Sequence, residues 1–283
     1  MELLKYNRLS FLVAAVIIFA GCSKDDSYFS LNQSVDSRVE QSFGWNDKHP
    51  ATEIVVNSDD YKIFCMSDSH VGTTVNLDKF FNAAEKSGAS AVVMAGDLCS
   101  GRESDYEVLN KHLPSGDSIP IFKVAGNHDL HYEGWSQFFT RFGSSTYMFT
   151  VKTPSGSDLF ICLDTSEGTL GKVQLSWLSN ILNNQRQNYR HCIVVTHNNF
   201  FRVKQAESTN PLIEEITVLV ELFTKNHVDM LISGHDHRSD DRLFGVTRYI
   251  VMDPLEDSSG NPGYFVLRAA DGNLEYRFVT ITN

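Results

Sequence analysis

The sequence predicts an α/β fold with a largely parallel sheet, on two observations. First, apolar runs of strand length alternate with amphipathic segments of helix length over most of the chain, as in α/β domains. Second, 283 residues with 42% hydrophobic and 21% charged side chains suffice for one large globular domain, or for two small ones.

The predicted elements follow each other in a regular order. The predicted strands are residues 61–68, 91–97, 119–129, 146–151, 158–164, 191–197, 228–237, 246–252, 263–269 and 274–280. The predicted helices are residues 76–88, 104–113, 135–143, 173–183 and 211–225. The helix at 76–88 is supported by an apolar face and a stop signal, namely Leu77, Phe80, Phe81, Ala84 and Gly88. The apolar stripe of the last helix consists of Leu212, Ile216, Leu219, Val220 and Phe223. The last three strands follow one another without a helix, so the end of the sheet is expected to be antiparallel.

The N-terminal segment resembles a bacterial lipoprotein signal. Lys5 and Arg8 precede an apolar run at 11–20, and the sequence "FAGC" places Cys22 where such signals are cleaved and lipidated. Phe19 departs from the pattern, since Leu, Val or Ile is commoner at that position. We therefore expect a signal peptide at 1–21 and a lipid on Cys22. The alternative is an uncleaved anchor that contains a cysteine by chance.

The next residues predict where the protein resides. "SKDDS" behind Cys22 resembles the export signal of surface lipoproteins in Bacteroidetes-type bacteria, so we expect a protein lipid-anchored to the outer membrane and exposed on its outer face. Residues 22–52 are rich in Ser, Asp, Asn and Gln with little periodicity, which indicates a flexible tether. The folded domain is then expected at 53–283.

The formal charge of −11 argues against nucleic-acid binding, because phosphate backbones are held by excess Lys and Arg.

Four cysteines remain after Cys22. Cys65, Cys99, Cys162 and Cys192 form no CxxC pair, and three of them lie in apolar runs. Buried free thiols are expected, although an exported location leaves a disulfide open.

Polar residues that could bind metal follow five of the apolar runs. They are Asp68, His70, Asp97, Asn127, His128, His197, His235 and His237. The carboxyl ends of strands in an α/β sheet line one crevice, so these residues are expected to converge. Nitrogen and oxygen ligands suit Mn, Fe, Co, Ni or Zn, and even seven of these eight residues exceed what one tetrahedral ion needs. Two ions that share a carboxylate are therefore expected. The glycines before Asp97, Asn127 and His235 would allow sharp turns and a close approach of ligands.

This ordered set resembles the calcineurin-like metallophosphoesterase superfamily, with all five motifs present between residues 62 and 238. The resemblance implies a four-layer α/β/β/α fold, in which two β-sheets form a sandwich flanked by helices, with a dinuclear metal centre at the strand ends. It implies that Asp68, His70 and His237 hold the first metal and that Asn127, His197 and His235 hold the second. Asp97 would bridge the two, and His128 would face the leaving group without binding metal.

The implied activity is hydrolysis of a small phosphate ester by a hydroxide that bridges the metals. "GDLCSGRESDY" and "LDTSEGTLGKVQLSWLSNIL" resemble the cyclic-nucleotide and glycerophosphodiester phosphodiesterase branch, so a phosphodiester is the expected substrate. A phosphomonoesterase on the same site is the alternative. A metal-binding surface lipoprotein without catalysis also stays open. An HD-type helical phosphohydrolase is disfavoured, because both His-Asp pairs follow strand-like runs.

Overall fold

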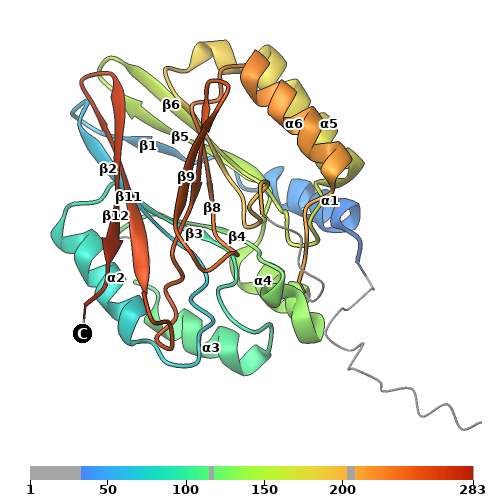
Figure 1. Cartoon of the computed structure of the whole chain (residues 1–283), viewed down its shortest axis with the longest axis vertical. Helices are drawn as coiled ribbons and strands as arrows, with labels where there is room; N and C mark the ends of the chain where they lie inside the picture. The colour runs from blue at the N-terminus through green and yellow to red at the C-terminus, as the bar shows by residue number, and fades with distance from the viewer. Residues whose placement is uncertain (1–32, 115–117, 203–207, 283) are drawn as a thin grey trace, which may run out of the picture.

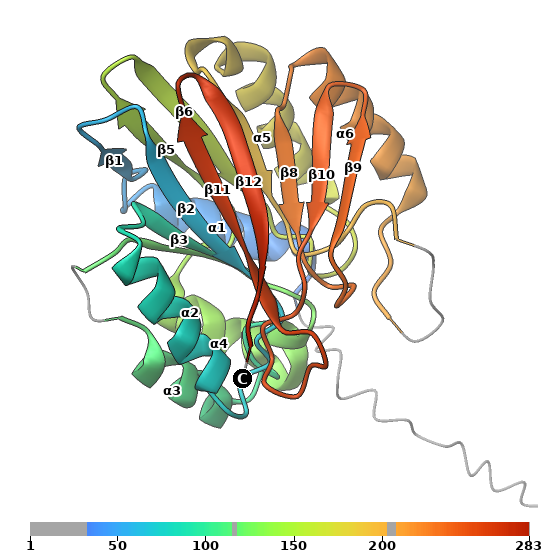
Figure 2. The same ribbon diagram turned by 60° about the vertical axis from the view of Figure 1, so that its left-hand side comes forward.

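The computed structural model describes residues 33–114, 118–202 and 208–282 (Figure 1). Two mixed sheets are stacked face to face, and helices cover both outer faces (Figure 2). The four-layer sandwich implied by the resemblance is therefore confirmed.

The larger sheet has seven strands in the order β1-β5-β6-β7-β8-β10-β9. Their bounds are Glu53–Val55 (β1), Tyr147–Thr153 (β5), Gly156–Cys162 (β6), Cys192–Val195 (β7), Met230–Ser233 (β8), Asp240–Phe244 (β9) and Thr247–Val251 (β10). The three strands β6, β7 and β8 run parallel to one another, so the ends of β7 and β8 lie at the same edge. The short strands β1 and β9 were not predicted from the sequence.

The smaller sheet has five strands in the order β12-β11-β2-β3-β4. Their bounds are Tyr61–Met66 (β2), Ala91–Ala95 (β3), Ile121–Val124 (β4), Gly263–Ala270 (β11) and Asn273–Thr280 (β12). The strands β2, β3 and β4 are parallel neighbours, whereas β11 and β12 are antiparallel, as predicted for the end of the chain. The prediction is wrong for β10, which lies in the larger sheet and pairs in parallel with β8.

The helices form the two outer layers. Val75–Lys86 (α2), Glu103–His112 (α3) and Gly134–Phe142 (α4) lie on the smaller sheet, and Gly171–Asn184 (α5) and Ile213–Lys225 (α6) lie on the larger one (Figure 1). Two short 3₁₀ helices in the described part of the chain, His128–Glu133 and Arg186–Asn188, complete the connections. Among the described residues, no helix combines the length and the apolar character needed to cross a membrane.

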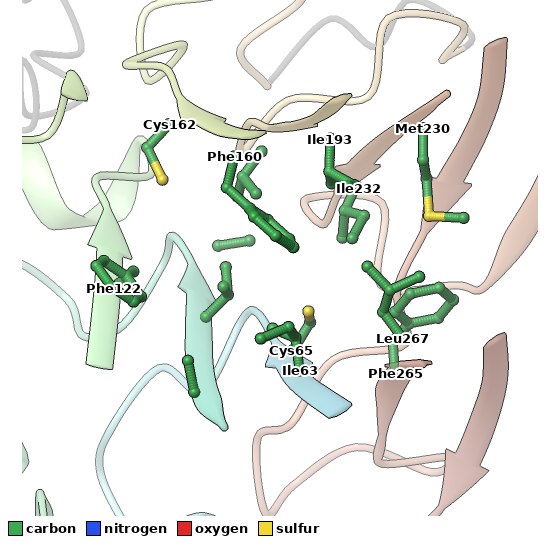
Figure 3. Close-up of a cluster of buried hydrophobic side chains, with 14 of the residues drawn as sticks. Ile63, Cys65, Phe122, Phe160, Cys162, Ile193, Met230, Ile232, Phe265 and Leu267 are labelled. Carbon is green, nitrogen blue, oxygen red and sulfur yellow. The ribbon is translucent and has the colours of Figure 1, made fainter. Parts of the chain in front are cut away.

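Three apolar cores hold these layers together. Between the two sheets, Ile63, Phe160 and Ile232 contribute to a buried cluster (Figure 3). Neighbouring residues on the same strands, such as Phe64 on β2, point instead to the helices, so these strands are apolar on both faces. Such strands place their first polar residues at their ends, where the chain leaves the core.

Two predictions about individual residues are confirmed by burial. The helix face of Leu77, Phe80, Phe81 and Ala84 is buried against the smaller sheet. The four cysteines at 65, 99, 162 and 192 are free and buried, so they act as small apolar side chains.

The prediction of a flexible tether is wrong for its second half. Residues Val35–Asn46 form a helix (α1) that packs against α5 and β5. The helix is anchored by a charge rather than by an apolar stripe: the buried Arg38 guanidinium donates from Nε to Asp164 Oδ2 at 2.9 Å. Sequence periodicity does not reveal such an anchor. Residues 1–32, including the predicted signal peptide and Cys22, lie outside the described residues.

Candidate metal centre

The eight predicted site residues all lie beyond the carboxyl ends of parallel strands, and the two sheets bring them together. Asp68 and His70 follow β2, Asp97 follows β3, Asn127 and His128 follow β4, His197 follows β7, and His235 and His237 follow β8. Both sheets therefore contribute residues to one crevice. The residues meet there because parallel strands end at the same edge of a sheet.

One group of side chains consists of Asp68, His70 and His237, whose potential ligand atoms lie within 4.8 Å of one another. His237 Nε2 is 3.3 Å from Asp68 Oδ1 and 3.2 Å from His70 Nε2. Asp68 is fully buried, and its Oδ1 makes no hydrogen bond with the part of the chain that the structure describes. A buried carboxylate oxygen without a donor needs a cation as its partner.

A second group surrounds His197. Its Nε2 lies 3.2 Å from Asp97 Oδ2, 3.1 Å from His235 Nδ1 and 3.2 Å from Asn127 Oδ1. Asp97, His197 and His235 are all buried, so water screens their interactions weakly. This is the set that the resemblance assigns to the second metal, together with Asp97.

The hydrogen bonds of the two histidines show what this second group can accept. His197 Nδ1 is 2.9 Å from the Ala95 carbonyl oxygen, and His235 Nε2 is 2.9 Å from the Thr209 carbonyl oxygen. A carbonyl oxygen only accepts, so each of these nitrogens carries its proton there. In the neutral rings, His197 Nε2 and His235 Nδ1 therefore direct lone pairs at each other. A metal ion between them fits this donor set, and the backbone carbonyls fix both ring orientations.

The pKa shifts of His197 and His235 also favour a bound cation in the second group. Burial opposes a charge on His197, but the carboxylate of Asp97 overrides it and raises the pKa of His197 to about 9. Burial, followed by the neighbouring His197, lowers the pKa of His235 to about 3. The pocket thus attracts a single positive charge to the place where the two rings meet, which a bound cation would supply.

Asp97 lies between the two groups. Its Oδ2 is 3.2 Å from His197 Nε2 and 3.7 Å from His70 Nε2, while its Oδ1 accepts a hydrogen bond of 2.8 Å from the His128 backbone N–H. One oxygen therefore faces both clusters, as a bridging ligand must. His128 Nε2 is 4.0 Å from the same oxygen, and its side chain is 42% exposed, so it borders the site from the solvent side.

The backbone at this site is strained. Five of the eight residues are non-glycine residues with positive φ, namely Asp68 (52°), His70 (37°), Asp97 (50°), His235 (73°) and His237 (52°). Such conformations cost on the order of 1–3 kcal/mol each and cluster at functional sites, because the surrounding fold must impose them. Here they turn the side chains inward directly after a strand.

The glycines before the candidate ligands allow neighbouring side chains to pack closely against the backbone, more than they allow the chain to turn. A Cβ on Gly126 would lie 2.2 Å from Asp97 Oδ1, and one on Gly234 would lie 2.4 Å from Asp68 Oδ2, yet neither glycine has positive φ. Only Gly96 has both features, with φ +86° and a Cβ position 2.7 Å from His197 Nδ1. The expected close approach is confirmed. The positive φ angles that turn the chain occur mostly at the candidate ligands themselves.

Asp129 organises the loops that carry Asp97 and Asn127. Its buried carboxylate accepts backbone hydrogen bonds from Leu98 and Cys99 at 3.0 Å and from Gly126 at 2.8 Å. These direct contacts give Asp129 a structural role.

Some supporting residues escape sequence reasoning. Asp236 looks like a spacer between two histidines, but Asn199 Nδ2 donates to it at 2.7 Å and Arg202 Nε lies 3.2 Å from it. Glu256 lies 3.7 Å from His237 Nδ1. It lies in the loop after β10 and belongs to none of the five motifs, so only the fold places it here.

Comparisons with known proteins agree with this geometry. The family model of the calcineurin-like phosphoesterases matches residues 61–239. The search of the curated proteins found no match.

Several solved structures share the fold. GAP50, the anchor in the inner membrane complex of Plasmodium, has a TM-score of 0.62 at 15% identity, covering 78% of this chain and 84% of that one. A dimetal phosphatase from Danio rerio has a TM-score of 0.59 at 11% identity, covering 78% and 99%. A candidate 5′-nucleotidase from Staphylococcus aureus has a TM-score of 0.55 at 16% identity. The match covers 79% of this chain and 55% of the latter. The chain belongs to the calcineurin-like phosphoesterase family and is a metal-dependent phosphoric ester hydrolase.

Proposed function

We propose that the chain hydrolyses phosphodiesters at a two-metal centre. The observation that carries the proposal is the position of Asp97 Oδ2, which faces a cluster of Asp68, His70 and His237 on one side and His197 with His235 on the other. Asn127 completes the second cluster. Two divalent ions in these positions would lower the pKa of a water molecule and hold phosphate oxygens. Mn, Fe, Co, Ni and Zn all suit the ligand set.

His128 is the residue of this chain that we assign to the leaving group. It emerges next to Asp97 but remains open to solvent, so a substrate can reach its ring. The Asp97 carboxylate also accepts the His128 backbone N–H, which fixes where the side chain leaves the loop. From this position His128 would stabilise or protonate the departing oxygen.

The expected preference for a diester rests on two segments that resemble the phosphodiesterase branch, "GDLCSGRESDY" and "LDTSEGTLGKVQLSWLSNIL". Asp68 and Asp97 are buried in the site, and Glu256 stands behind His237. Two bound divalent ions would outweigh these three carboxylates, so the loaded site would attract a diester and a monoester alike. A direct comparison of the two substrates therefore decides between them.

A comparison of two substrates tests this preference. After removal of metal with a chelator, the protein is reloaded with each ion in turn and assayed on bis(p-nitrophenyl) phosphate and p-nitrophenyl phosphate. We expect hydrolysis only with metal, and a kcat/KM at least about tenfold higher for the diester, equivalent to about 1.4 kcal/mol. A higher kcat/KM for the monoester with every ion would overturn the diester assignment and leave the monoesterase alternative.

We further propose that a lipid on Cys22 holds the protein on the outer face of the outer membrane. The support comes from the signal-like sequence before Cys22 and from "SKDDS" behind it. We expect the wild type in the membrane fraction, accessible to external protease on intact cells, and the Cys22→Ala variant outside that fraction. Retention of Cys22→Ala in the membrane would refute the lipid anchor, and protection from protease would refute the surface location.

A further inference from the structure

A cavity lies beside β4 and the start of β5. It has a volume of about 410 Å³ and is also bounded by α5, by the end of α4, and by the end of α1 with the segment that follows it. This volume lies in the range of small-molecule sites. None of the eight candidate site residues lines it, so it is separate from the hydrolytic centre.

Aromatic side chains form much of its wall. The rings that line it are those of Trp45, Phe122, Phe142, Tyr147 and Trp177. Two of the chain's three tryptophans are among them. None of these five side chains is fully exposed, and Phe122 stacks on the inter-sheet core through Phe149 at 3.6 Å. Rings fixed in this way form an apolar aromatic wall, which suits a ligand with an aromatic body.

One cation projects into this aromatic environment. The Lys123 ammonium lies 4.8 Å from the centre of the Phe142 ring and 3.5 Å from the Ile121 carbonyl oxygen. Within residues 33–114, 118–202 and 208–282, no carboxylate forms an ion pair with it. Burial lowers the pKa of Lys123 to about 8, and no neighbouring acid counteracts the effect. A desolvated ammonium without a counter-charge is unfavourable and can be neutralised by an anion.

The other ionisable groups of the cavity are compatible with an anion. Asp47 also lines it but is exposed to solvent, so its charge is well screened. The exposed His49 ring is stacked on Trp45 at 4.0 Å. The chain as a whole carries −11, which disfavours anions elsewhere on its surface. Attraction of an anion to this cavity therefore depends on the Lys123 ammonium.

We propose that this cavity is a second ligand site, which takes a small flat aromatic molecule bearing one anionic group. The aromatic body lies among Trp45, Tyr147 and Trp177, and the anionic group pairs with the Lys123 ammonium. The site binds its ligand without chemistry, and its occupation is separate from phosphate-ester hydrolysis.

A matched pair of probes tests the proposal. Naphthalene-2-carboxylate and naphthalene-2-carboxamide share body and shape but differ in charge. Titration calorimetry on the full, metal-loaded chain at pH 7 should show one carboxylate per chain, bound at least about tenfold tighter than the amide, which corresponds to about 1.4 kcal/mol. Lys123→Met should reduce this ratio to below about threefold. Lys152→Met is the control, since Lys152 is exposed on neighbouring β5, and its ratio should stay at the wild-type value.

Two further measurements establish whether the carboxylate binds beside Lys123 and away from the metals. Lys123→Gln should weaken carboxylate binding as Lys123→Met does, and both variants should keep wild-type hydrolysis, which shows that they are folded. Asp97→Asn should keep carboxylate binding, because the probe does not sit on the metals. Equal affinity for the two probes, an unchanged ratio in both Lys123 variants, or loss of binding in Asp97→Asn would overturn the proposal.

Discussion

Replacement of Asp97 by Asn is expected to lower kcat/KM for bis(p-nitrophenyl) phosphate by at least about 10³-fold. The amide keeps the shape of the side chain and an oxygen acceptor for the His128 N–H. It removes the negative charge that faces both clusters, so the affinity for both cations falls. The loss should appear as reduced metal content together with reduced rate, measured on the same sample.

Replacement of His128 by Ala provides the contrast. Its ring is not assigned to a metal, so metal content should stay at the wild-type value while kcat falls by about 10²- to 10⁴-fold. Asp105→Asn, a change on the surface of α3, is the control and should match the wild type in both measurements. If both Asp97→Asn and His128→Ala remain active, the assignment of these residues is wrong.

Replacement of Arg38 by Met is expected to lower the free energy of unfolding by about 3–5 kcal/mol, because it leaves the buried Asp164 carboxylate without its counter-charge. Asp164 and Arg38 are each 1% exposed, and Nε and Nη2 of Arg38 both donate to this carboxylate. Urea unfolding measures the change. Arg268→Met is the control, since the Arg268–Asp60 pair is exposed and should contribute less than about 1 kcal/mol.

The pH dependence of this variant follows from the same pair. In the wild type, burial raises the pKa of Asp164 but Arg38 outweighs it and holds the pKa below its ordinary value. The stabilisation is therefore present above the unfolded pKa and is lost as the pH falls through the folded pKa. Without Arg38, burial dominates and the pKa rises above its ordinary value. The deficit of Arg38→Met should then be larger at pH 8 than at pH 5, and a deficit that grows toward pH 5 would contradict this account.

Arg38 also connects α1 to the metal centre. Its partner Asp164 precedes Thr165, whose Oγ1 accepts backbone hydrogen bonds from His197 and Asn198, both at 3.0 Å. The helix lies outside residues 61–239, which the family model matches. Loss of the Arg38 anchor should consequently weaken metal binding at His197 as well as stability.

The convergence of the candidate ligands could be predicted from the sequence because these residues obey a local rule. Each candidate ligand follows an apolar run, and parallel strands bring their ends to one edge whatever the length of chain between them. This rule predicts that His197 and His235 converge, and the family resemblance implies that they share one metal; His197 Nε2 and His235 Nδ1 lie 3.1 Å apart.

The parts of the structure that were not predicted from the sequence depend on contacts between residues far apart in the chain, which no local pattern encodes. Helix α1 has few apolar residues and is held by Arg38, whose partner is 126 residues away along the chain. Strand β1 has three residues and needs β5 to exist as a strand. The support of His237 by Glu256 likewise arises only when β10 and β8 are paired, because this pairing returns the chain to the site.

The most direct test of the two-metal centre is the metal content of the purified wild-type protein after reloading and removal of free ions, measured by elemental analysis. The geometry predicts two ions per chain, with activity that requires both, and fewer than one ion per chain in Asp97→Asn. A wild-type protein that is fully active with one ion, or that binds none, would contradict it.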